Sequence, residues 1–376
     1  FARMAEGGVC ATNHSHGTQD ESRILDEAEA VSRAARDVGI HVAFAAPFMD
    51  RNLIAYGDQK TFLAAADPTL RPALQARIDQ SKDVRAFLRQ VDEMAAFEHA
   101  GFSVQYCPVG AQWVSEPALA AIAEASALND RRIHMHFLET RYQREWADHA
   151  YPDGIARRLD ELGLLSPRLS LAHGVYLTEE ECALMAERGV IVSVNTSSNL
   201  RLRSGIAPVG SFLKTGLAFG AGMDAQPMDD DDDMLREMRL LYLHQRGFGL
   251  DDALTAPRLF EAACVDGRRA VIGADGGGRL DVGAPADFLV LDYAAMAADV
   301  LSPAADPAVV LLTRATRRHI VRLIVRGDRA ALEAELIAEA RAAWDAAPPD
   351  DAVAAATKRA VRRYYGCGCH FGAGLR

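Results

Sequence analysis

The sequence has no apolar run that approaches the roughly 18 residues of a membrane-spanning helix. It also lacks an excess of basic residues, because 41 lysines and arginines stand against 52 aspartates and glutamates, a formal net charge of −11. A general nucleic-acid-binding surface is therefore not expected. We predict that neither a membrane nor a nucleic acid is a partner of this chain.

Cysteine is scarce and scattered. Only six occur in 376 residues, mostly inside apolar segments, and only Cys367 and Cys369 lie close together. This usage predicts buried thiols in a reducing compartment, the cytoplasm. The tail sequence Cys367-Gly368-Cys369-His370 has compact metal-ligand types, but a single such group in a glycine-rich terminus predicts a flexible end.

The chain does not begin with methionine, and its opening FARMAEGG lacks the layout of a signal peptide. This opening is typical of the end of a helix, so we expect further sequence upstream of Phe1. The hydrophobic content of 49% suits one large α/β domain of barrel size with an appendage, or two domains.

Short apolar runs alternate with helix-like segments between residues 9 and 224. The runs predict strands at GVCATNH, IHVAFAAPF, FSVQYCPV, RRIHMHF, LSLAH, VIVSV and GLAFGAGMD. Helical spacing lies between most of them, for example over residues 20–38 and 68–98. The repeated βα unit predicts a parallel sheet with right-handed crossovers. We therefore expect an α/β fold, a (β/α)₈ TIM-like barrel that lacks its first strand.

Polar side chains follow three of these strands at their carboxyl ends. His136 ends one strand and Glu139 comes three residues later, while His173 and Asp224 end two others. Ligands bind at the carboxyl ends of parallel strands, so these side chains are expected to share a pocket. Imidazole and carboxylate groups from separate strands predict a hydrolytic metal centre.

The pattern changes after Asp224. Helices are predicted over 232–246 and 250–264, and the acidic run Asp229–Asp233 predicts a solvated helix start. Two β segments with glycine, proline and aspartate turns follow, GRLDVGAPADFLVLD and IVRLIVRGD. We predict a hydrolase barrel over 1–265, a small β-sandwich appendage over 266–330, and a helical segment and tail over 331–376.

In this order and spacing the motifs resemble those of the amidohydrolase superfamily, in the branch of cytosine, guanine and pterin deaminases and triazine chlorohydrolases. The resemblance is carried by HMHFLET, LAHGVYLTEEE, SSNLRLRSGIAPV and GMDAQPMDDDDDMLREMRL. GRLDVGAPADFLVLD resembles the return of that family's chain to its β-sandwich. The resemblance spans most of residues 1–330.

The resemblance implies that His136 and Asp224 bind one divalent metal ion per subunit, zinc or iron(II). It also implies catalytic roles for Glu139, His173 and Asp224. Asp224 accepts the proton of the attacking water, His173 holds that water, and Glu139 protonates a ring nitrogen and then the leaving amine. The implied reaction is deamination of a small heterocycle (pyrimidine, purine, pterin or triazine) with release of ammonia. A homo-oligomer is implied as well.

For the other histidines, a structural role is weighed against a functional one. The family's metal-binding His-x-His is expected upstream of Phe1, and His14-Ser15-His16 follows what resembles the second strand instead. His14 and His16 are weighed equally as loop histidines and as substrate contacts. His134, two residues before His136 on the same strand, is predicted to be structural.

Three residues are predicted to bind the substrate. Gln112 and Trp113 could hold a flat heterocycle by hydrogen bonding and stacking, although Trp113 is equally well explained as a core residue. Asn199 could contact the substrate or shape its own loop. The same centre could serve a chlorohydrolase or a cyclic-amide hydrolase. A barrel without the upstream histidines would be a non-catalytic scaffold or binding protein.

Overall fold

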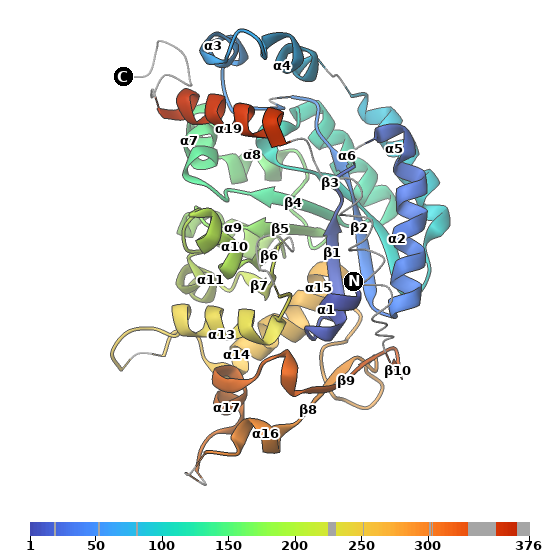
Figure 1. The fold of residues 1–376 in the computed structure, drawn as a ribbon, viewed down its shortest axis with the longest axis vertical. Helices are drawn as coiled ribbons and strands as arrows, with labels where there is room; N and C mark the ends of the chain where they lie inside the picture. Colours follow the sequence, from blue (N-terminus) through green and yellow to red (C-terminus); the bar gives the residue numbers. More distant parts are fainter. Residues whose placement is uncertain are drawn as a thin grey trace.

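The computed structural model describes residues 1–18, 20–51, 53–79, 82–224, 231–250, 252–300, 302, 304–329 and 351–366. Seven parallel strands form one curled sheet in the order β1 to β7, with helices packed around it (Figure 1). They are β1 (Ala11–Ser15), β2 (His41–Phe48), β3 (Phe102–Pro108), β4 (Ile133–Phe137), β5 (Leu169–His173), β6 (Ile191–Val194) and β7 (Ala218–Ala221). The predicted α/β-barrel fold is confirmed.

Helices connect the strands and cover the outside of the sheet. They are α1 (Ala2–Glu6), η1 (Glu21–Arg23), α2 (Ile24–Val38), α3 (Gln59–Ala65), α4 (Arg71–Ile78), α5 (Val84–Met94), η2 (Ala95–Phe97), η3 (Ala111–Trp113), α6 (Glu116–Asn129), α7 (Arg141–Ala150), α8 (Ile155–Glu161), α9 (Glu179–Glu187), α10 (Thr196–Leu202), α11 (Val209–Thr215) and α13 (Met234–Gln245). The α9 helix begins at Thr178, whose side chain forms a capping box with Glu181.

Two segments differ from the sequence-based expectation. The helical stretch predicted over 68–98 is divided into α4 and α5, because the Asp83 side chain accepts the backbone N–H of Arg85 and starts a new helix. Asn199, which was expected to lie in a loop, lies within α10 (Thr196–Leu202). At Asp83 a polar cap decides the boundary, and hydrophobic spacing alone does not reveal it.

The segment after α13 packs against the sheet as α14 (Ala256–Glu261), η4 (Ala262–Asp266) and α15 (Gly267–Val271). The α15 helix contacts both β1 and β7, the two edge strands of the described sheet. A side chain at Gly220 of β7 would lie 2.8 Å from the Cα atom of Gly267. Two glycines therefore allow the helix to approach this edge closely.

A smaller antiparallel sheet follows, in the order β10-β9-β8. It contains β8 (Phe288–Leu291), β9 (Ile320–Val325) and β10 (Asp328–Arg329), with α16 (Tyr293–Ala297), α17 (Pro307–Arg314) and η5 (Arg317–His319) between β8 and β9. The predicted β appendage is thus present, and within the described residues it is a single layer. The predicted domain boundaries at 265 and 330 stay predictions.

The chain ends, as far as it is described, in α19 (Asp351–Gly366). The predicted weak metal-ligand group at Cys367–His370 lies outside the described residues. Among the described cysteines, Cys107 and Cys182 are buried thiols, whereas Cys264 is exposed, contrary to expectation. Within the described ranges, no helix has the length and apolar character needed to span a membrane.

The described part of the acidic run is not a solvated helix start. The Asp233 side chain caps α13 by accepting the backbone N–H groups of Leu235 and Arg236, and it also accepts that of Arg317 at 2.9 Å. Asp232 is buried and lies 3.4 Å from Arg3. These carboxylates join α13 to the chain's beginning and to the region of the small sheet. Asp229 and Asp230 lie outside the described residues.

Candidate metal centre

The carboxyl ends of β4, β5 and β7 bring three predicted residues together. In the register of β4 and β5, Phe137 pairs with His173, so the strands end side by side. One potential ligand atom from each of His136, His173 and Asp224 lies within 4.8 Å of the others. Side chains separated by up to 88 residues of sequence (136 to 224) therefore share one site.

His136 is held so that one ring nitrogen faces this site. Its Nδ1 lies 3.0 Å from the backbone carbonyl of Val109. Because a carbonyl only accepts hydrogen bonds, Nδ1 carries the proton and Nε2 is left as the basic nitrogen. Burial and the neighbouring His173 lower the pKa of His136, while Asp224 and Glu139 oppose this shift. The imidazole is therefore neutral, which is the form that binds a metal.

His173 is almost completely buried and stacks on His136, with ring centroids 5.5 Å apart. Its Nδ1 lies 3.0 Å from Asn199 Oδ1. Its Nε2 lies 3.9 Å from Glu139 Oε2 and 4.0 Å from Asp224 Oδ2. The asparagine thus orients the ring from behind, and the opposite nitrogen faces both carboxylates.

The two carboxylates are held by neighbouring polar groups. The Ser204 hydroxyl donates to Glu139 Oε1 at 3.2 Å. The backbone N–H of Glu139 donates to Gln143 Oε1 at 2.7 Å. The Ser198 hydroxyl donates to Asp224. Ser204 follows α10, far along the chain from Glu139, so only the fold could reveal that contact.

The backbone is strained where these side chains leave the sheet. Leu138, His173 and Asp224 have φ angles of 46°, 77° and 64°. Non-glycine residues rarely adopt such angles, and each costs on the order of 1–3 kcal/mol. The three strained residues follow or end the three strands that form the site, so the surrounding packing holds the strand ends in a costly conformation.

The predicted substrate-binding residues lie around the site in different ways. Gln112 and Trp113 belong to η3, which follows β3, and Gln112 is buried whereas Trp113 is half-buried. The Trp113 ring meets the Tyr56 ring edge-on at 5.6 Å. Asn199 is buried behind His173. Contact of these three residues with a substrate stays a prediction.

The other histidines at this end lie outside the cluster. His134 is buried beside Ser170, with 2.8 Å between its Nδ1 and the hydroxyl oxygen, and burial lowers its pKa to about 3. It is a neutral core residue, in line with its predicted structural character. His14 and His16 form a pair of their own, with 3.1 Å between Nε2 and Nδ1, and His16 reaches Glu27 at 2.7 Å.

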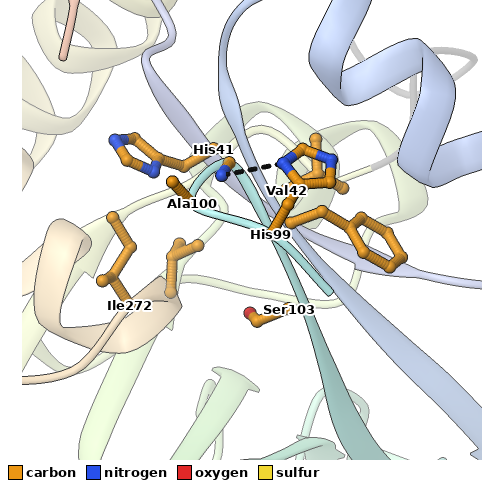
Figure 2. Close-up of a pocket in the computed structure, with 9 residues that line it drawn as sticks. His41, Val42, His99, Ala100, Ser103 and Ile272 are labelled. Atoms are coloured by element: carbon orange, nitrogen blue, oxygen red, sulfur yellow. Dashed lines mark hydrogen bonds between the residues drawn. The ribbon is translucent and has the colours of Figure 1, made fainter. Parts of the chain in front are cut away.

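A second hollow lies at the opposite, amino ends of β2 and β3 (Figure 2). It is lined by His41, Val42, His99, Ala100, Gly101, Phe102, Ser103, Val271 and Ile272. The His99 ring accepts the backbone N–H of Gly101 at 3.1 Å, the dashed line in Figure 2, and its other nitrogen pairs with the Ser32 carbonyl at 3.1 Å. His41 pairs with Asp287 at 2.9 Å. These histidines already have structural partners.

Comparison with known proteins identifies relatives of this chain. The sequence model described as the amidohydrolase family matches residues 1–329. The chain is 36% identical over 180 residues to a 5'-deoxyadenosine deaminase of Methanothermobacter thermautotrophicus, covering 47% of this chain and 42% of that protein. It is 34% identical over 234 residues to a 5-methylthioadenosine/S-adenosylhomocysteine deaminase of Nitratidesulfovibrio vulgaris, covering 61% and 51%. The chain thus spans about half the length of these relatives.

A solved structure shares the fold. The zinc complex of an atrazine chlorohydrolase from Arthrobacter aurescens superposes with a TM-score of 0.74, at 22% identity, over 91% of this chain and 75% of that one. At this identity the likeness concerns the architecture of the barrel and its appendage.

Proposed function

The chain belongs to the amidohydrolase family, and from this premise we propose that it is a metal-dependent hydrolase that removes the amino group of a nitrogen heterocycle. Water replaces the amine at an amidine-like ring carbon, and ammonia leaves. The observation that carries the proposal is the meeting of His136, His173 and Asp224 within 4.8 Å at the carboxyl ends of three strands.

The donor set fits a divalent metal ion. His136 would bind it through Nε2, because Nδ1 is occupied by the Val109 carbonyl, and Asp224 would bind it through a carboxylate oxygen. Imidazole and carboxylate donors suit zinc and also iron(II). A bound zinc ion lowers the pKa of a coordinated water from 15.7 to about 7 and so supplies hydroxide at neutral pH. We propose zinc, one ion per subunit.

The remaining groups of the site would move protons and hold the water. Asp224 accepts the proton of the attacking water. His173, oriented by Asn199, presents Nε2 towards both carboxylates and would hold the water in place. Glu139 lies on the same side and would protonate the ring nitrogen and then the departing amine. The hydrogen bond from Ser204 keeps its carboxylate in this position.

The names of the relatives support a substrate class. The two deaminases that match over part of this chain are named for adenosine derivatives altered at the 5' position. We propose such nucleosides as the first substrates to test, ahead of pyrimidines, guanine, pterins and triazines. The predicted homo-oligomer and cytoplasmic location are part of the same proposal.

The test is metal analysis and a product screen with the protein expressed from its complete gene. We expect about one zinc ion per subunit and ammonia release from at least one aminated heterocycle. The screen should contain 5'-deoxyadenosine, 5'-methylthioadenosine, adenosine, guanine, cytosine, a pterin and an aminotriazine. A chlorotriazine should be included, because chloride release without ammonia release would favour the chlorohydrolase alternative.

The matched control is Asp224→Asn, which keeps the size of the side chain but removes its charge. It should lower both the metal content and the rate. A wild-type protein with no stoichiometric metal and no hydrolysis of any substrate would contradict the proposal and favour a non-catalytic barrel.

A further inference from the structure

We propose that the C-terminal helix α19 is a working part of the site, because it holds Tyr56 in place as a substrate-recognition residue next to Glu139. This inference rests on the proposed function for the nature of the ligand. The role of the helix in holding Tyr56 stands on contacts alone. Neither Tyr56 nor α19 belongs to any motif of the sequence.

Two consecutive tyrosines of α19 bind the backbone of Tyr56. The Tyr365 hydroxyl accepts the backbone N–H of Tyr56 at 2.9 Å, and the Tyr364 hydroxyl donates to its carbonyl at 3.2 Å. The Tyr56 and Tyr365 rings also meet, with centroids 5.9 Å apart. Both backbone polar groups of Tyr56 are thus satisfied by a helix about 300 residues further along the chain.

The α19 helix also packs against the segments next to Tyr56 and against α7. Tyr364 is completely buried in a small apolar cluster apart from the main core, formed with Ala55, Phe62, Ala66, Leu74 and Ala360. The Tyr365 ring packs on Tyr142 of α7 with centroids 4.5 Å apart. Figure 1 shows α19 beside α3 and α7 accordingly. The α7 helix starts two residues after Glu139, so α19 links the Tyr56 loop to the segment that carries the proposed acid.

The Tyr56 phenol points to the site. The side chains of Gln143 and Gln112 lie beside it and lower the pKa of Tyr56, while the nearby Glu139 carboxylate raises it. Burial raises the pKa of Tyr56 to about 12, so the hydroxyl keeps its proton at neutral pH. Gln143 also accepts the backbone N–H of Glu139.

The chemistry of this patch defines its ligand. A neutral phenol and two amides offer hydrogen-bond donors and acceptors but no charge, so they suit a neutral polar group such as a ring amide, a ring nitrogen or a sugar hydroxyl. Gln112 follows Gly110, which pairs with His136, so the patch adjoins the proposed metal ligand. Tyr56 would contact the part of the heterocycle or its sugar that does not react.

The experiment compares Tyr56→Phe, Tyr365→Phe and the double variant with Tyr293→Phe, an exposed tyrosine of α16, as the matched control. We expect Tyr56→Phe to raise KM about tenfold with kcat nearly unchanged, because a contact to the unreactive part of the substrate is lost. Tyr365→Phe should raise KM by about threefold, since it only loosens Tyr56. The double variant should match Tyr56→Phe alone, because Tyr365 acts through Tyr56.

Hydrogen exchange of the peptide that contains Tyr56 separates this inference from the proposed function. Tyr365→Phe should speed exchange of that amide, and Tyr293→Phe should not. Unchanged exchange in Tyr365→Phe would overturn the role of the helix, whatever the activity. Faster exchange with additive KM effects, or with no KM effect, would overturn the recognition role of Tyr56. A wild-type protein that hydrolyses nothing would contradict the proposed function and the substrate role with it, while exchange still decides whether α19 holds Tyr56.

Discussion

The two ends of the barrel use the same kinds of side chain in opposite ways. At the carboxyl ends, His173 stands 3.9 Å and 4.0 Å from the carboxylates of Glu139 and Asp224. At the amino ends, His41 lies 2.9 Å from Asp287, and Arg268 bonds both Asp287 and Asp275. Charged groups in direct contact satisfy one another, whereas the more widely spaced groups at the carboxyl ends could share a bound ion.

The contrast extends to what each end connects. Asp287 lies just before β8 and also accepts the backbone N–H of Arg326 at 2.6 Å, so the amino-end network joins the barrel to the small sheet. Arg268 and His41 are buried, Arg268 to 5% exposure, whereas Asp287 is half-buried and Asp275 is exposed. We therefore assign stability to the network, and the proposed function assigns the chemistry to the carboxyl-end cluster, as is general for barrels of this class.

The largest expected effect is on catalysis. Glu139→Gln keeps the side chain's shape but removes the proton that the proposed mechanism transfers. We expect kcat to fall by about 10²–10⁴-fold, with unchanged metal content and no loss of thermal stability. Steady-state ammonia release and a thermal melt measure both. A marked drop in melting temperature would show that Glu139 is structural. It would then contradict the division between a catalytic carboxyl end and a structural amino end.

The amino-end network should show the reverse pattern. Asp287→Asn leaves Arg268 buried with one fewer negative partner, so we expect a loss of about 3–5 kcal/mol in the free energy of unfolding. Metal content should not change. Asp299→Asn is the control, because Asp299 pairs with Arg314 at an exposed position, and such pairs contribute little. Denaturant titration gives the free energy of unfolding of the two variants. Equal values for Asp287→Asn and Asp299→Asn would contradict the structural role of Asp287.

A smaller effect is expected behind the candidate metal centre. Asn199→Ala removes the acceptor that orients His173, and the loss of such a supporting partner typically costs about 10–100-fold in metal affinity or activity. Asn129→Ala, on the exposed end of α6, should change neither property. Isothermal titration with zinc and rate measurements are the appropriate readouts. Full activity of Asn199→Ala would indicate that packing alone fixes the His173 ring.

The smallest effect concerns acid stability. Burial alone would raise the pKa of Asp287, but hydrogen bonds from His41, the Arg326 backbone and Arg268 outweigh it and lower the pKa. Its stabilising contribution is therefore complete above the ordinary aspartate pKa, near 3.9, and is lost as the pH falls below that value. Unfolding free energies measured from pH 5 to pH 2 should decline more steeply for the wild type than for Asp287→Asn. Parallel curves would argue against the network.

The sequence was informative where the signal is local. Alternating strands and helices predicted the barrel, and His136, His173 and Asp224 could be identified because each follows an apolar run. The supporting contacts could not be found in this way. Ser204 meets Glu139, and Tyr365 meets Tyr56, across 65 and 309 positions of the chain. No periodicity records such pairs, because they depend on how separate elements pack.

For the acidic run, the prediction from the sequence was wrong. Asp232 and Asp233 have the composition of a solvated helix start, and their burial follows only from the approach of Arg3 and of the chain at Arg317. The α3 helix escaped prediction because it is short. Its apolar face is covered mainly by α19, which comes much later in the sequence.

The left-handed backbone at the end of β7 has a consequence for directed evolution. Glycine tolerates the φ of 64° at Asp224 far better than aspartate does. A library selected only for heat resistance should therefore enrich glycine at that turn and discard the carboxylate. Selection for durability alone would thus remove a proposed metal ligand while leaving the barrel intact, so both properties must be screened together.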